Sequence, residues 1–522
     1  MNRLPLLLCI TLFSPLALAD SAVVGTGSVA SCSTAAYNTA MLILTDGPQA
    51  RGGTLTFNCG PQPHSIAMDR DWALTDGVLI DGGGRITLDG QNLHRFYQTF
   101  LLFEGQTSVT LKDITLIRGF ANTDFGGAIY QHSGTSLTLD GVTIADSRAT
   151  TSGGAIASET QTTLTIIDSQ FLNNRAGFGG ALAIRAATQI SGSKFAGNRA
   201  EAGNAEGGAI QSYEQTLTTT TSIFEENISA RDGGAIYKRD ATLTLEDVSL
   251  LRNNAPTNGA GVYAHASTSV IGDRIKVIGN IGHGVHVEGG LTLRRASFLG
   301  NRNNAIGKSS LNIKSSPASL LVEKSVFANN DNGISIERDA EATGISGTLR
   351  LDNVTLHNNR FSSIGLLDFA GGVTLLIDQS SIVEPGCIPV AAFRGQVIYT
   401  SSIIFGGGIS NCTNYGNPPL QFASGGNNLL GPGCPLGGGD SAVQALADLQ
   451  LSDLAEQGGA VATLLPASTS PAIDRRNCVN VDARDLPRPI DGDQNGSSLC
   501  DIGAVERQVT ETGSTLLSDS FE

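Results

Sequence analysis

Residues 168–182 read D-S-Q-F-L-N-N-R-A-G-F-G-G-A-L, and variants of this phrase recur over roughly 250 residues of the chain. The phrase holds a short apolar segment ending at Phe171, an asparagine three residues later at Asn174, a loop, and Gly-Gly-Ala-Leu from Gly179. A phrase that returns at nearly constant spacing indicates a repeated structural unit that cannot bury its apolar face alone. The recurrence therefore predicts an array of stacked units.

Three short elements keep step along this array. The first is Gly-Gly-Ala-Ile or a close relative, the second is apolar-x-x-Asn, and the third is Leu-x-Leu, which precedes the second by a short turn. The first element begins at Gly126, Gly153, Gly179, Gly207, Gly233 and Gly259. Three strands and three turns in about 21 to 29 residues form one rung of a parallel β-solenoid, with apolar side chains stacked about 4.8 Å apart. The sequence thus predicts an all-β fold.

The asparagine of the second element returns in eight windows. Its positions are Asn174, Asn198, Asn227, Asn253, Asn280, Asn301, Asn330 and Asn359. An amide carries two donors and one acceptor, so amides at the same turn of successive rungs can bond to one another and to buried turn carbonyls. We predict a structural asparagine ladder. The alternative, a row that faces a glycan, fits less well because the spacing is tied to the apolar residue three positions earlier.

The N-terminus has the features of a secretory signal peptide at residues 1–19. Arg3 precedes an apolar run, and Ala17-Leu18-Ala19 forms a small-residue cleavage site. No later stretch reaches the roughly 18 apolar residues needed to cross a bilayer. We therefore expect an exported protein with no transmembrane segment in its mature chain.

The formal net charge is -15. A surface of this sign repels nucleic acid and anionic lipid headgroups, and it favours cations or neutral glycans as partners. We therefore expect no nucleic-acid partner. The simpler interpretation is that an acidic surface keeps an exported protein in solution.

The cysteines of the mature chain lie only near the two ends of the repeat array. In an exported protein this distribution suggests end regions that are held by disulfides, around an array that is held by stacking. We predict bonds between Cys32 and Cys59, between Cys412 and Cys434, and between Cys478 and Cys500. Cys387 is then left over, and a bond between Cys387 and Cys412 is the alternative.

These observations divide the chain into five segments. We expect a signal peptide at 1–19, an N-terminal cap at 20–60, parallel β-helix repeats at 61–405, a disulfide-stapled C-terminal cap region at 406–507 and a disordered tail at 508–522. The N-terminal cap should contain one short amphipathic helix within residues 32–44, where Tyr37, Met41 and Leu44 are apolar. Such a helix would cover the open edge of the first rung.

The alternation of apolar-x-x-Asn with Gly-Gly-Ala-Ile resembles the repeats of polymorphic outer membrane proteins, a group of bacterial right-handed parallel β-helix proteins. Residues 470–474 and 500–506, S-P-A-I-D and C-D-I-G-A-V-E, are similar to the C-terminal region of exported β-helix proteins of the choice-of-anchor type. The segment 32–59 is similar to their N-terminal cap. The resemblance implies a right-handed, pectate-lyase-like β-helix at the outer cell surface or secreted, with the periplasm as the alternative.

Enzymes also use this fold, so catalytic groups need to be considered. Asp273-Arg274-Ile275-Lys276 and Gly282-His283-Gly284-Val285-His286-Val287-Glu288 are similar to polygalacturonase motifs, but their order is reversed and the sequence has no Asp-Asp pair. A polysaccharide lyase needs a basic group or a metal beside the uronate and a base for its C5 proton. The candidates for such a site are Arg274, Lys276, His283 and Glu288.

A calcium-binding pattern lies outside the rungs. Residues 491–496 read D-G-D-Q-N-G, which points the side-chain oxygens of Asp491, Asp493 and Asn495 at one cation while glycine permits the sharp turn. The twelfth position holds Ile502 in place of the expected Glu, so we assign the fourth ligand to Asp501. The alternative is a solvent-exposed acidic turn.

Two functions follow from these patterns. The first is a secreted or cell-surface β-helix that binds a glycan or a surface in the manner of an adhesin, because solenoids present long exposed faces. The second is a lyase or hydrolase that acts on an acidic polysaccharide. An enzyme should show a cleft lined by at least three carboxylates or by a carboxylate-Arg-Lys cluster, whereas a binding module should show aromatic side chains or a flat polar face.

Overall fold

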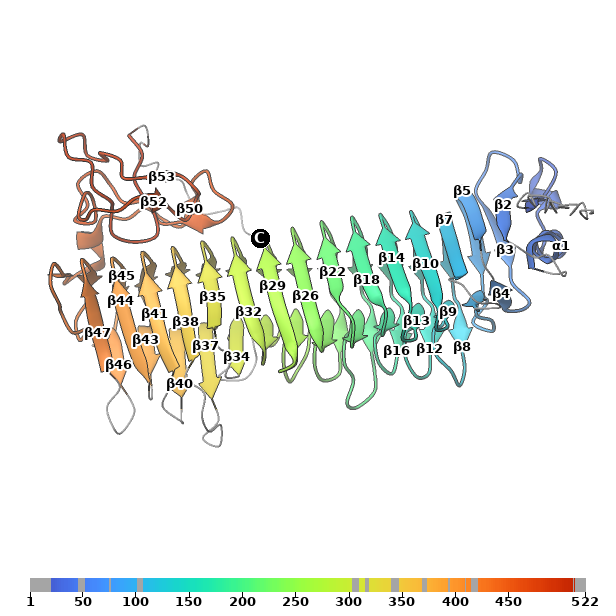
Figure 1. The fold of residues 1–522 in the computed structure, drawn as a ribbon, viewed down its shortest axis with the longest axis horizontal. Coiled ribbons are helices and arrows are strands. Elements are labelled where there is room, and N and C mark those ends of the chain that lie inside the picture. Colours follow the sequence, from blue (N-terminus) through green and yellow to red (C-terminus); the bar gives the residue numbers. More distant parts are fainter. Residues whose placement is uncertain are drawn as a thin grey trace, which may run out of the picture.

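The computed structural model describes residues 20–45, 52–74, 77–100, 107–302, 309–314, 319–338, 347–368, 373–392, 395–408, 410–414, 421–509 and 511. The predicted signal peptide and most of the predicted tail lie outside these residues. The described chain forms an elongated rod of stacked strands, with one helix at its N-terminal end and an irregular region folded back along the side of its last rungs (Figure 1). This architecture confirms the predicted parallel β-helix.

Two of the three long faces of the rod are series of parallel strands that merge through β5 and β7. The first series, here sheet 1, comprises β1 (Asp20–Val24), β2 (Gly53–Phe57), β5 (Val78–Asp89), β7 (Thr107–Ile117), β10 (Thr135–Asp140), β14 (Thr163–Ile167), β18 (Ala187–Ser191), β22 (Leu217–Thr220), β26 (Ala241–Glu246), β29 (Thr268–Asp273), β32 (Gly290–Arg294), β35 (Ser319–Glu323), β38 (Gly347–Asp352), β41 (Val373–Asp378), β44 (Gln396–Thr400) and β47 (Gln421–Gly426). The second series, here sheet 2, comprises β3 (His64–Ala67), the second halves of β5 and β7, β11 (Thr143–Ala145), β15 (Gln170–Leu172), β19 (Lys194–Ala196), β23 (Ile223–Glu225), β27 (Ser249–Leu251), β30 (Lys276–Ile278), β33 (Ser297–Leu299), β36 (Val326–Ala328), β39 (Thr355–His357), β42 (Ser381–Glu384), β45 (Ile403–Gly406), β48 (Leu429–Leu430) and β49 (Ser441–Ala442).

The third face, here sheet 3, is a single 14-stranded parallel sheet. Its strands are β4 (Trp72–Leu74), β6 (Tyr97–Thr99), β9 (Ile129–Gln131), β13 (Ile156–Ser158), β17 (Leu182–Ile184), β21 (Ile210–Tyr213), β25 (Ile236–Arg239), β28 (Val262–Ala264), β31 (Val285–Val287), β34 (Leu311–Lys314), β37 (Asn332–Arg338), β40 (Ser362–Asp368), β43 (Ile388–Ala392) and β46 (Cys412–Asn414). A short sheet 4 lies between sheets 2 and 3 and consists of β8 (Phe120–Ala121), β12 (Arg148–Ala149), β16 (Arg175–Ala176), β20 (Arg199–Ala200) and β24 (Ile228–Ser229).

The core consists of side chains stacked on their counterparts in the next rung. Phe171 and Phe195 are paired across β15 and β19, and their ring centroids lie 4.6 Å apart with a 3° angle between planes. The next pair, Phe195 and Phe224, has a separation of 4.8 Å. All three rings are fully buried. The predicted vertical stacking of equivalent residues is therefore present.

The eight predicted asparagines form a continuous ladder. From each to the next, Nδ2 donates to Oδ1 at 2.9–3.1 Å, as from Asn198 to Asn227. Nδ2 donates a second time to a backbone carbonyl, such as that of Phe171 from Asn198. The last asparagine, Asn359, donates to Glu384, which takes the place of an amide in the following rung. A buried row of polar side chains is thus fully paired.

The Gly-Gly pairs lie where the backbones of neighbouring rungs approach each other closely. Gly179 has a φ of +55°, in the left-handed region that favours glycine. A Cβ on the following Gly180 would lie 2.1 Å from the carbonyl oxygen of Gly208 in the next rung. Neither position accepts a side chain without displacing backbone, which explains why the motif recurs with the period of the rungs.

The N-terminal end is covered by helix α1 (Thr34–Thr45), which follows the short 3-10 helix η1 (Val29–Ser31). The helix was expected within residues 32–44. It buries Tyr37, Met41 and Leu44 against the first rungs, and the Tyr37 hydroxyl lies 2.7 Å from that of Tyr97. β1 and β2 already belong to sheet 1, so the β-helix begins within the segment predicted as a separate cap.

The β-helix also continues beyond residue 405, where we expected it to end. β46, β47 and β48 extend sheets 3, 1 and 2 in turn. The apolar-x-x-Asn spacing is lost there, but strand pairing depends on the backbone and does not need that motif. The predicted disulfide between Cys412 and Cys434 lies in this last part of the helix.

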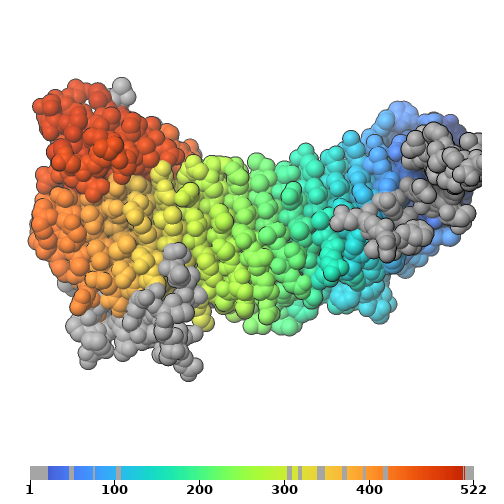
Figure 2. Space-filling model, in the orientation of Figure 1, coloured from blue at the N-terminus to red at the C-terminus, as the bar shows by residue number. Residues whose placement is uncertain are grey.

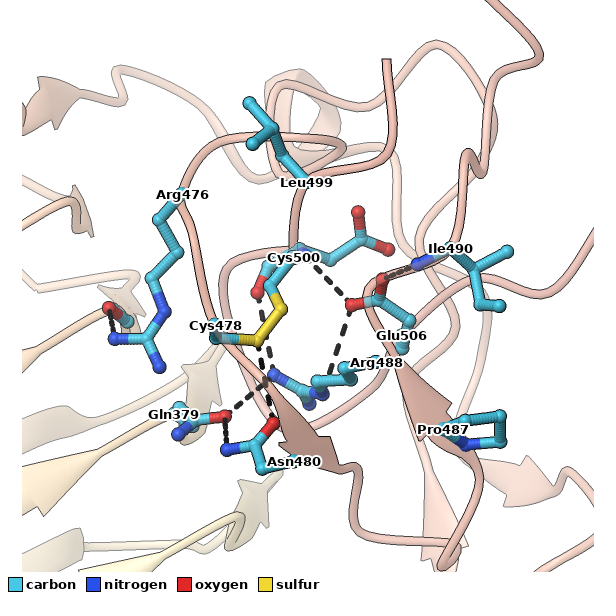
Figure 3. The surroundings of a disulfide bond; sticks show 12 residues. Gln379, Arg476, Cys478, Asn480, Pro487, Arg488, Ile490, Leu499, Cys500 and Glu506 are labelled. Carbon is cyan, nitrogen blue, oxygen red and sulfur yellow. Dashed lines mark hydrogen bonds and ion pairs between the residues drawn. A yellow bond between two sulfur atoms is a disulfide. The ribbon is translucent and has the colours of Figure 1, made fainter. Parts of the chain in front are cut away.

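The irregular C-terminal region starts after β49 and contains η2 (Leu446–Leu449), β50 (Ala455–Glu456), β51 (Ala462–Thr463), β52 (Asn480–Val481) and β53 (Pro487–Arg488). It rests on the side of the last rungs (Figure 2). Within it, Cys478 and Cys500 are bonded, and the buried guanidinium of Arg488 bonds to Gln379 of the helix at 3.0 Å (Figure 3). The three predicted disulfides are all formed, and Cys387 is a free, buried cysteine.

Candidate functional site: a tyrosine and carboxylate face on sheet 3

The outward face of sheet 3 carries a row of side chains that are in register from rung to rung. Each residue of this row directly follows the inward-facing apolar residue of the Gly-Gly-Ala-Ile motif. The row runs Tyr130, Ala157, Ala183, Gln211, Tyr237, Tyr263, His286 and Asn312. A second outward position, two residues later, contributes Arg185 and Tyr213. We name these residues the sheet 3 row.

Aromatic rings stack along part of this row. The rings of Tyr237 and Tyr263 lie 5.0 Å apart at 13°, and those of Tyr263 and His286 lie 5.1 Å apart at 8°. Tyr213 joins the stack at a steeper angle, 5.9 Å from Tyr237. Because each ring covers its neighbour, Tyr237 and Tyr263 are only 5% and 8% exposed, whereas Tyr213 is half-buried.

Three glutamates accept hydrogen bonds from the tyrosine hydroxyls. Tyr130 donates to Glu159 at 2.5 Å, Tyr263 donates to Glu288 at 2.9 Å, and Tyr213 donates to Glu206. Pairing of this kind fixes the direction of each phenol and leaves the remaining carboxylate lone pairs available as acceptors.

The pKa shifts along the row favour ionised glutamates beside neutral tyrosines. Burial acts to raise the pKa of Glu159, but hydrogen bonds from Tyr130 and Ser133 outweigh it and lower that pKa. Glu288 behaves in the same way, because the nearby His286 imidazole and the hydrogen bond from Tyr263 oppose burial and lower its pKa. Burial and then the neighbouring Glu206 raise the pKa of Tyr213. The face therefore presents strong hydrogen-bond acceptors at neutral pH.

A hollow opens where the row holds two alanines. Ala157 and Ala183 lie side by side, while Tyr130 and Tyr213 stand at its two ends. The resulting cavity has a volume of about 320 Å³, and Glu159 and Arg185 also line it. The guanidinium of Arg185 lies 5.8 Å from the ring centre of Tyr213. A small ring-shaped ligand with several hydroxyl groups suits a hollow with aromatic ends and charged edges.

Asp232 is the most deeply placed carboxylate of this region. It is 4% exposed, and it lies in the rung next to Glu206 as that residue's strand partner. Its oxygens contact Arg231 Nε at 3.2 Å and Asn258 Nδ2 at 3.1 Å. Burial raises the pKa of Asp232 in spite of these partners. Perturbed carboxylates of this kind are more frequent at functional sites than elsewhere.

The structure divides the four candidate catalytic residues between two faces. His283 and Glu288 lie beside sheet 3, where His286 Nε2 is 3.5 Å from Glu288 and Asn312 Nδ2 is 3.1 Å from His283 Nε2. Arg274 lies in the turn between β29 and β30, where it is bonded to Glu246, Asp247 and Asp273. Lys276 is exposed on β30 of sheet 2. The four side chains do not form one cluster. The chain turns a corner after β30, so Arg274 and Lys276 lie on a different part of the rod from His283 and Glu288, which flank β31.

The calcium pattern forms a group of three carboxylates whose members differ from those expected. Ligand oxygens of Asp474, Asp491 and Asp493 lie within 4.8 Å of one another. Asn495 is adjacent, with its Nδ2 donating to Asp493 at 2.9 Å. Asp501 is not part of the group, because it is fully buried and its carboxylate accepts from the backbone of Asp474 and Arg507. Asp474 thus replaces Asp501, and calcium binding itself stays a prediction.

The sheet 3 row was not predicted from the sequence. Its outward residues vary from alanine to tyrosine, so they give no periodic apolar signal. The alignment on Gly-Gly-Ala-Ile was nevertheless available, and the position after the isoleucine reads Tyr130, Ala157, Ala183, Gln211, Tyr237, Tyr263 and His286. A column that contains both tyrosines and alanines, directly after a repeated core position, is the signal that would have revealed the sheet 3 row.

Comparison with known protein families supports the predicted type of repeat. Residues 221–238 match the family model of the Chlamydia polymorphic membrane protein (Chlamydia_PMP) repeat. The matched segment holds Phe224, Asn227 and the Gly-Gly-Ala-Ile that starts at Gly233. The chain therefore contains the polymorphic membrane protein repeat that its sequence resembles. Curated proteins gave no match.

Several solved structures are similar to the chain at low identity. Tailspike protein 3 of bacteriophage CBA120 is 10% identical with a TM-score of 0.38, over 77% of this chain and 58% of that one. The periplasmic alginate epimerase AlgG is 10% identical with a TM-score of 0.34, over 72% and 85%. PfbA, a surface adhesin of Streptococcus pneumoniae, is 12% identical with a TM-score of 0.30, over 86% and 100%.

The described residues contain no helix long and apolar enough to cross a membrane.

Proposed function

We propose that this protein is an exported β-helix that binds an extended saccharide along sheet 3, with one sugar unit seated in the hollow over Ala157 and Ala183. The observation that carries the proposal is the gap of two alanines in a row otherwise filled by larger side chains. A side chain is missing there over two rungs, about 10 Å of the axis at 4.8 Å per rung. The walls of the gap, Tyr130 and Tyr213, supply an apolar contact at each end.

The chemistry of the walls favours a neutral or amino sugar. Glu159 lines the hollow and is an acceptor for sugar hydroxyl or ammonium groups, and it would repel a carboxylate. Glu206 lies behind the wall residue Tyr213, whose hydroxyl donates to it. The overall charge of -15 acts in the same direction. Export is supported by the N-terminal sequence and by three disulfides, which persist in oxidising compartments.

The test is to fill the hollow without disturbing the core. Ala183→Phe places a ring in the cavity from an outward position, and Tyr213→Ala removes one wall. Affinity of the full chain for neutral and amino-sugar oligosaccharides is measured by calorimetry. Both variants should weaken binding by about 1–2 kcal/mol or more, as expected for a central contact residue. Tyr213→Phe keeps the ring and should retain most of the affinity.

A matched control lies on another face. Ile271 on β29 is an exposed apolar residue, 45% accessible, and Ile271→Ala removes apolar surface from sheet 1. Its affinity should equal that of the parent protein. Equal losses in Ile271→Ala and Ala183→Phe, or no loss in Ala183→Phe, would contradict the assignment of the hollow.

A polysaccharide lyase or hydrolase is the second candidate function. It is favoured by Asp232, a buried carboxylate of raised pKa beside the ionisable Glu206. Here Asp232 would act as the proton donor, with the Glu206 carboxyl group beside it. Incubation with pectin, alginate and neutral glycans, with detection of unsaturated and reducing ends, tests this function. Products that persist unchanged in Asp232→Asn would exclude Asp232 from the chemistry.

A further inference from the structure

A second row of outward side chains runs beside the asparagine ladder, on a different part of the rod. From Arg175 onward, each residue directly follows a ladder asparagine, and Arg148 follows Ser147, whose backbone N–H donates to Asn174. The row therefore keeps the register of the rungs. It runs Arg148, Arg175, Arg199, Ile228, Asn254, Ile281, Arg302, Asp331 and Arg360. We name its five arginines the arginine row. Its position on sheet 4 and on the turns that continue sheet 4 separates it from the sheet 3 row.

Three of these arginines are stacked in adjacent rungs. Arg148 is the strand partner of Arg175, and Arg175 is the partner of Arg199. All three are exposed. Like charges directly opposite one another on neighbouring strands are destabilising. The arrangement therefore costs stability unless something outside the chain neutralises it.

Little of this charge is neutralised inside the protein. Arg175 faces Glu201 at 3.7 Å, and both side chains are about half exposed, so that pair is weak. Arg360 faces Asp331 at 3.7 Å and is 71% exposed. Within the part of the chain that the structure describes, Arg148, Arg199 and Arg302 form no ion pair.

The far end of the row enters a cavity of about 930 Å³. Arg302, Asp331 and Arg360 contribute to it from three successive rungs. Leu454 and Ala462 of the C-terminal region form its opposite wall. That region stands against the side of the last rungs (Figure 2). The row therefore leads from an open surface into a groove that the C-terminal region helps to line.

Two further side chains of the groove bear on its charge. His357 lines it, and burial lowers the pKa of this imidazole although Nδ1 contacts the carbonyl of Val383, so His357 is neutral at pH 7. Asn358 adds an amide without charge. Among the described residues, Asp331 is therefore the single acidic side chain that lines the groove, against two arginines.

From this juxtaposition we propose that the arginine row and the groove at its end bind a linear acidic polysaccharide, with successive carboxylates or sulfates held by successive arginines. The three stacked arginines form a line one side chain wide that repeats every rung, about 4.8 Å along the axis. Three rungs with uncharged residues at this position separate Arg199 from Arg302 at the groove. A thin chain with one anionic group per sugar can follow such a row. Planar guanidinium groups bind carboxylates and sulfates through paired hydrogen bonds, which sets them apart from lysine.

The shape and charge of the protein favour a polysaccharide over other polyanions. A membrane or a DNA duplex would contact more of the protein surface than the row alone, and the net charge of -15 opposes that. A narrow polymer avoids this repulsion because it contacts the row alone. The inference does not depend on the saccharide proposed for sheet 3. The hollow proposed for that saccharide lies on another face and is lined by other residues, among them Glu159.

The experiment measures binding of the full chain to polygalacturonate and to a sulfated glycan at low and high ionic strength. Dextran, a DNA duplex and phosphatidylglycerol vesicles are the comparison probes. We expect binding to one or both acidic glycans that weakens as salt is added. Arg175→Gln/Arg199→Gln should reduce that affinity about tenfold, since two charge-assisted contacts are lost. The same double variant should melt at the same temperature or slightly higher, because the stacked repulsion is relieved.

Matched controls use arginines of similar exposure that belong to neither proposed site. Arg239→Gln/Arg294→Gln removes the same charge from residues 51% and 54% exposed. This variant should keep full affinity for acidic glycans. Three results would each overturn the proposal. They are absence of binding to both acidic glycans at low salt, equal losses in the two double variants, and tighter binding of DNA or vesicles than of either glycan. Tyr213→Ala should leave acidic-glycan binding unchanged, so failure of the sheet 3 proposal would be seen separately.

Discussion

The β-helix and the C-terminal region are held together in different ways. In the β-helix, each rung places the same kinds of side chain against the next rung. Its stability comes from stacked aromatic rings and from the asparagine ladder. In the described residues of the C-terminal region, no group repeats. Arg484 is paired there with Asp482 at 2.8 Å, with neither side chain exposed, and Glu506 accepts from the backbone of Ile490 and Asp501.

The contrast leads us to expect that the β-helix tolerates the gain or loss of a whole rung, whereas the C-terminal region does not tolerate the loss of one partner of a buried pair. A rung contacts only its neighbours, so its stability is close to a sum of local terms. A buried ion pair such as Arg484–Asp482 has no second copy, and removing one partner leaves an unpaired charge that is costly to bury. The following predictions separate the two kinds of stabilisation, from the largest expected effect to the smallest.

Interrupting the ladder should have the largest effect. Asn227→Ala removes two bonds that Asn227 Oδ1 accepts from Asn198 and two that Nδ2 donates to Phe195 O and Asn253 Oδ1. Each unsatisfied buried group costs about 1 kcal/mol or more, so the helix should lose about 4 kcal/mol. Urea denaturation followed by far-ultraviolet circular dichroism measures the loss. The exposed Asn204→Ala, in the loop between β20 and β21 of the preceding rung, is the control and should change stability by less than about 0.5 kcal/mol. Similar values for the two variants would contradict a structural role for the ladder.

The carboxylate that ends the ladder should make the helix more stable in acid. Burial raises the pKa of Glu384 from 4.5 to about 7, although Ser363 and Asn359 donate to it. A group whose pKa is higher in the folded state adds stability below its unfolded pKa and loses it as pH rises through the folded value. Between pH 4.5 and about 8 the loss should approach 3 kcal/mol, at about 1.4 kcal/mol per pKa unit. Glu384→Gln cannot titrate and should flatten this part of the pH profile.

Asp501 supplies the comparison within the C-terminal region. Burial, followed by the charge of Glu506, raises the pKa of Asp501 to about 7, so its linkage has the same sign. Asp501→Asn should remove pH dependence from unfolding of the C-terminal region and leave that of the helix unchanged. Limited proteolysis between pH 5 and 8 distinguishes the two regions. A pH profile of the helix that is unchanged in Glu384→Gln would show that Glu384 titrates normally.

Calcium should have the smallest effect, confined to the C-terminal region. At a calcium concentration ten times the dissociation constant, binding to Asp474, Asp491 and Asp493 adds about 1.4 kcal/mol to the stability of that region. Calorimetry with calcium and with a chelator measures the difference. Asp491→Asn/Asp493→Asn should remove the response, whereas Asp448→Asn, an exposed aspartate of the same region, should keep it. A shift that survives the double variant would place the ion elsewhere.

The fold could be predicted from the sequence because its core is periodic. Phe171, Phe195 and Phe224 each precede a ladder asparagine by three residues, and stacking requires that spacing to persist. The end of the helix was less predictable. Beyond Phe405 the backbone pairs on through β46, β47 and β48, but no repeated side chain marks those rungs.

The candidate sites were harder to predict, because outward positions are free to vary. Tyr237 and Arg199 each sit one residue after a core or ladder position, and no packing rule selects them. Proximity in sequence was also misleading. Lys276 and His283 are seven residues apart, yet a rung turns a corner between them and places them on different faces. Only the register of the rungs, combined with the column of residues at each outward position, brings the functional side chains together.

The fixed register has a consequence for how such a chain can grow. Duplication of one window, such as the 26 residues that separate Gly207 from Gly233, would insert a complete layer and lengthen the rod by about 4.8 Å. Every outward column would gain one member at the same moment, so the two proposed binding tracks would lengthen together and stay aligned. The length of each proposed binding track is therefore set by the number of layers in the rod.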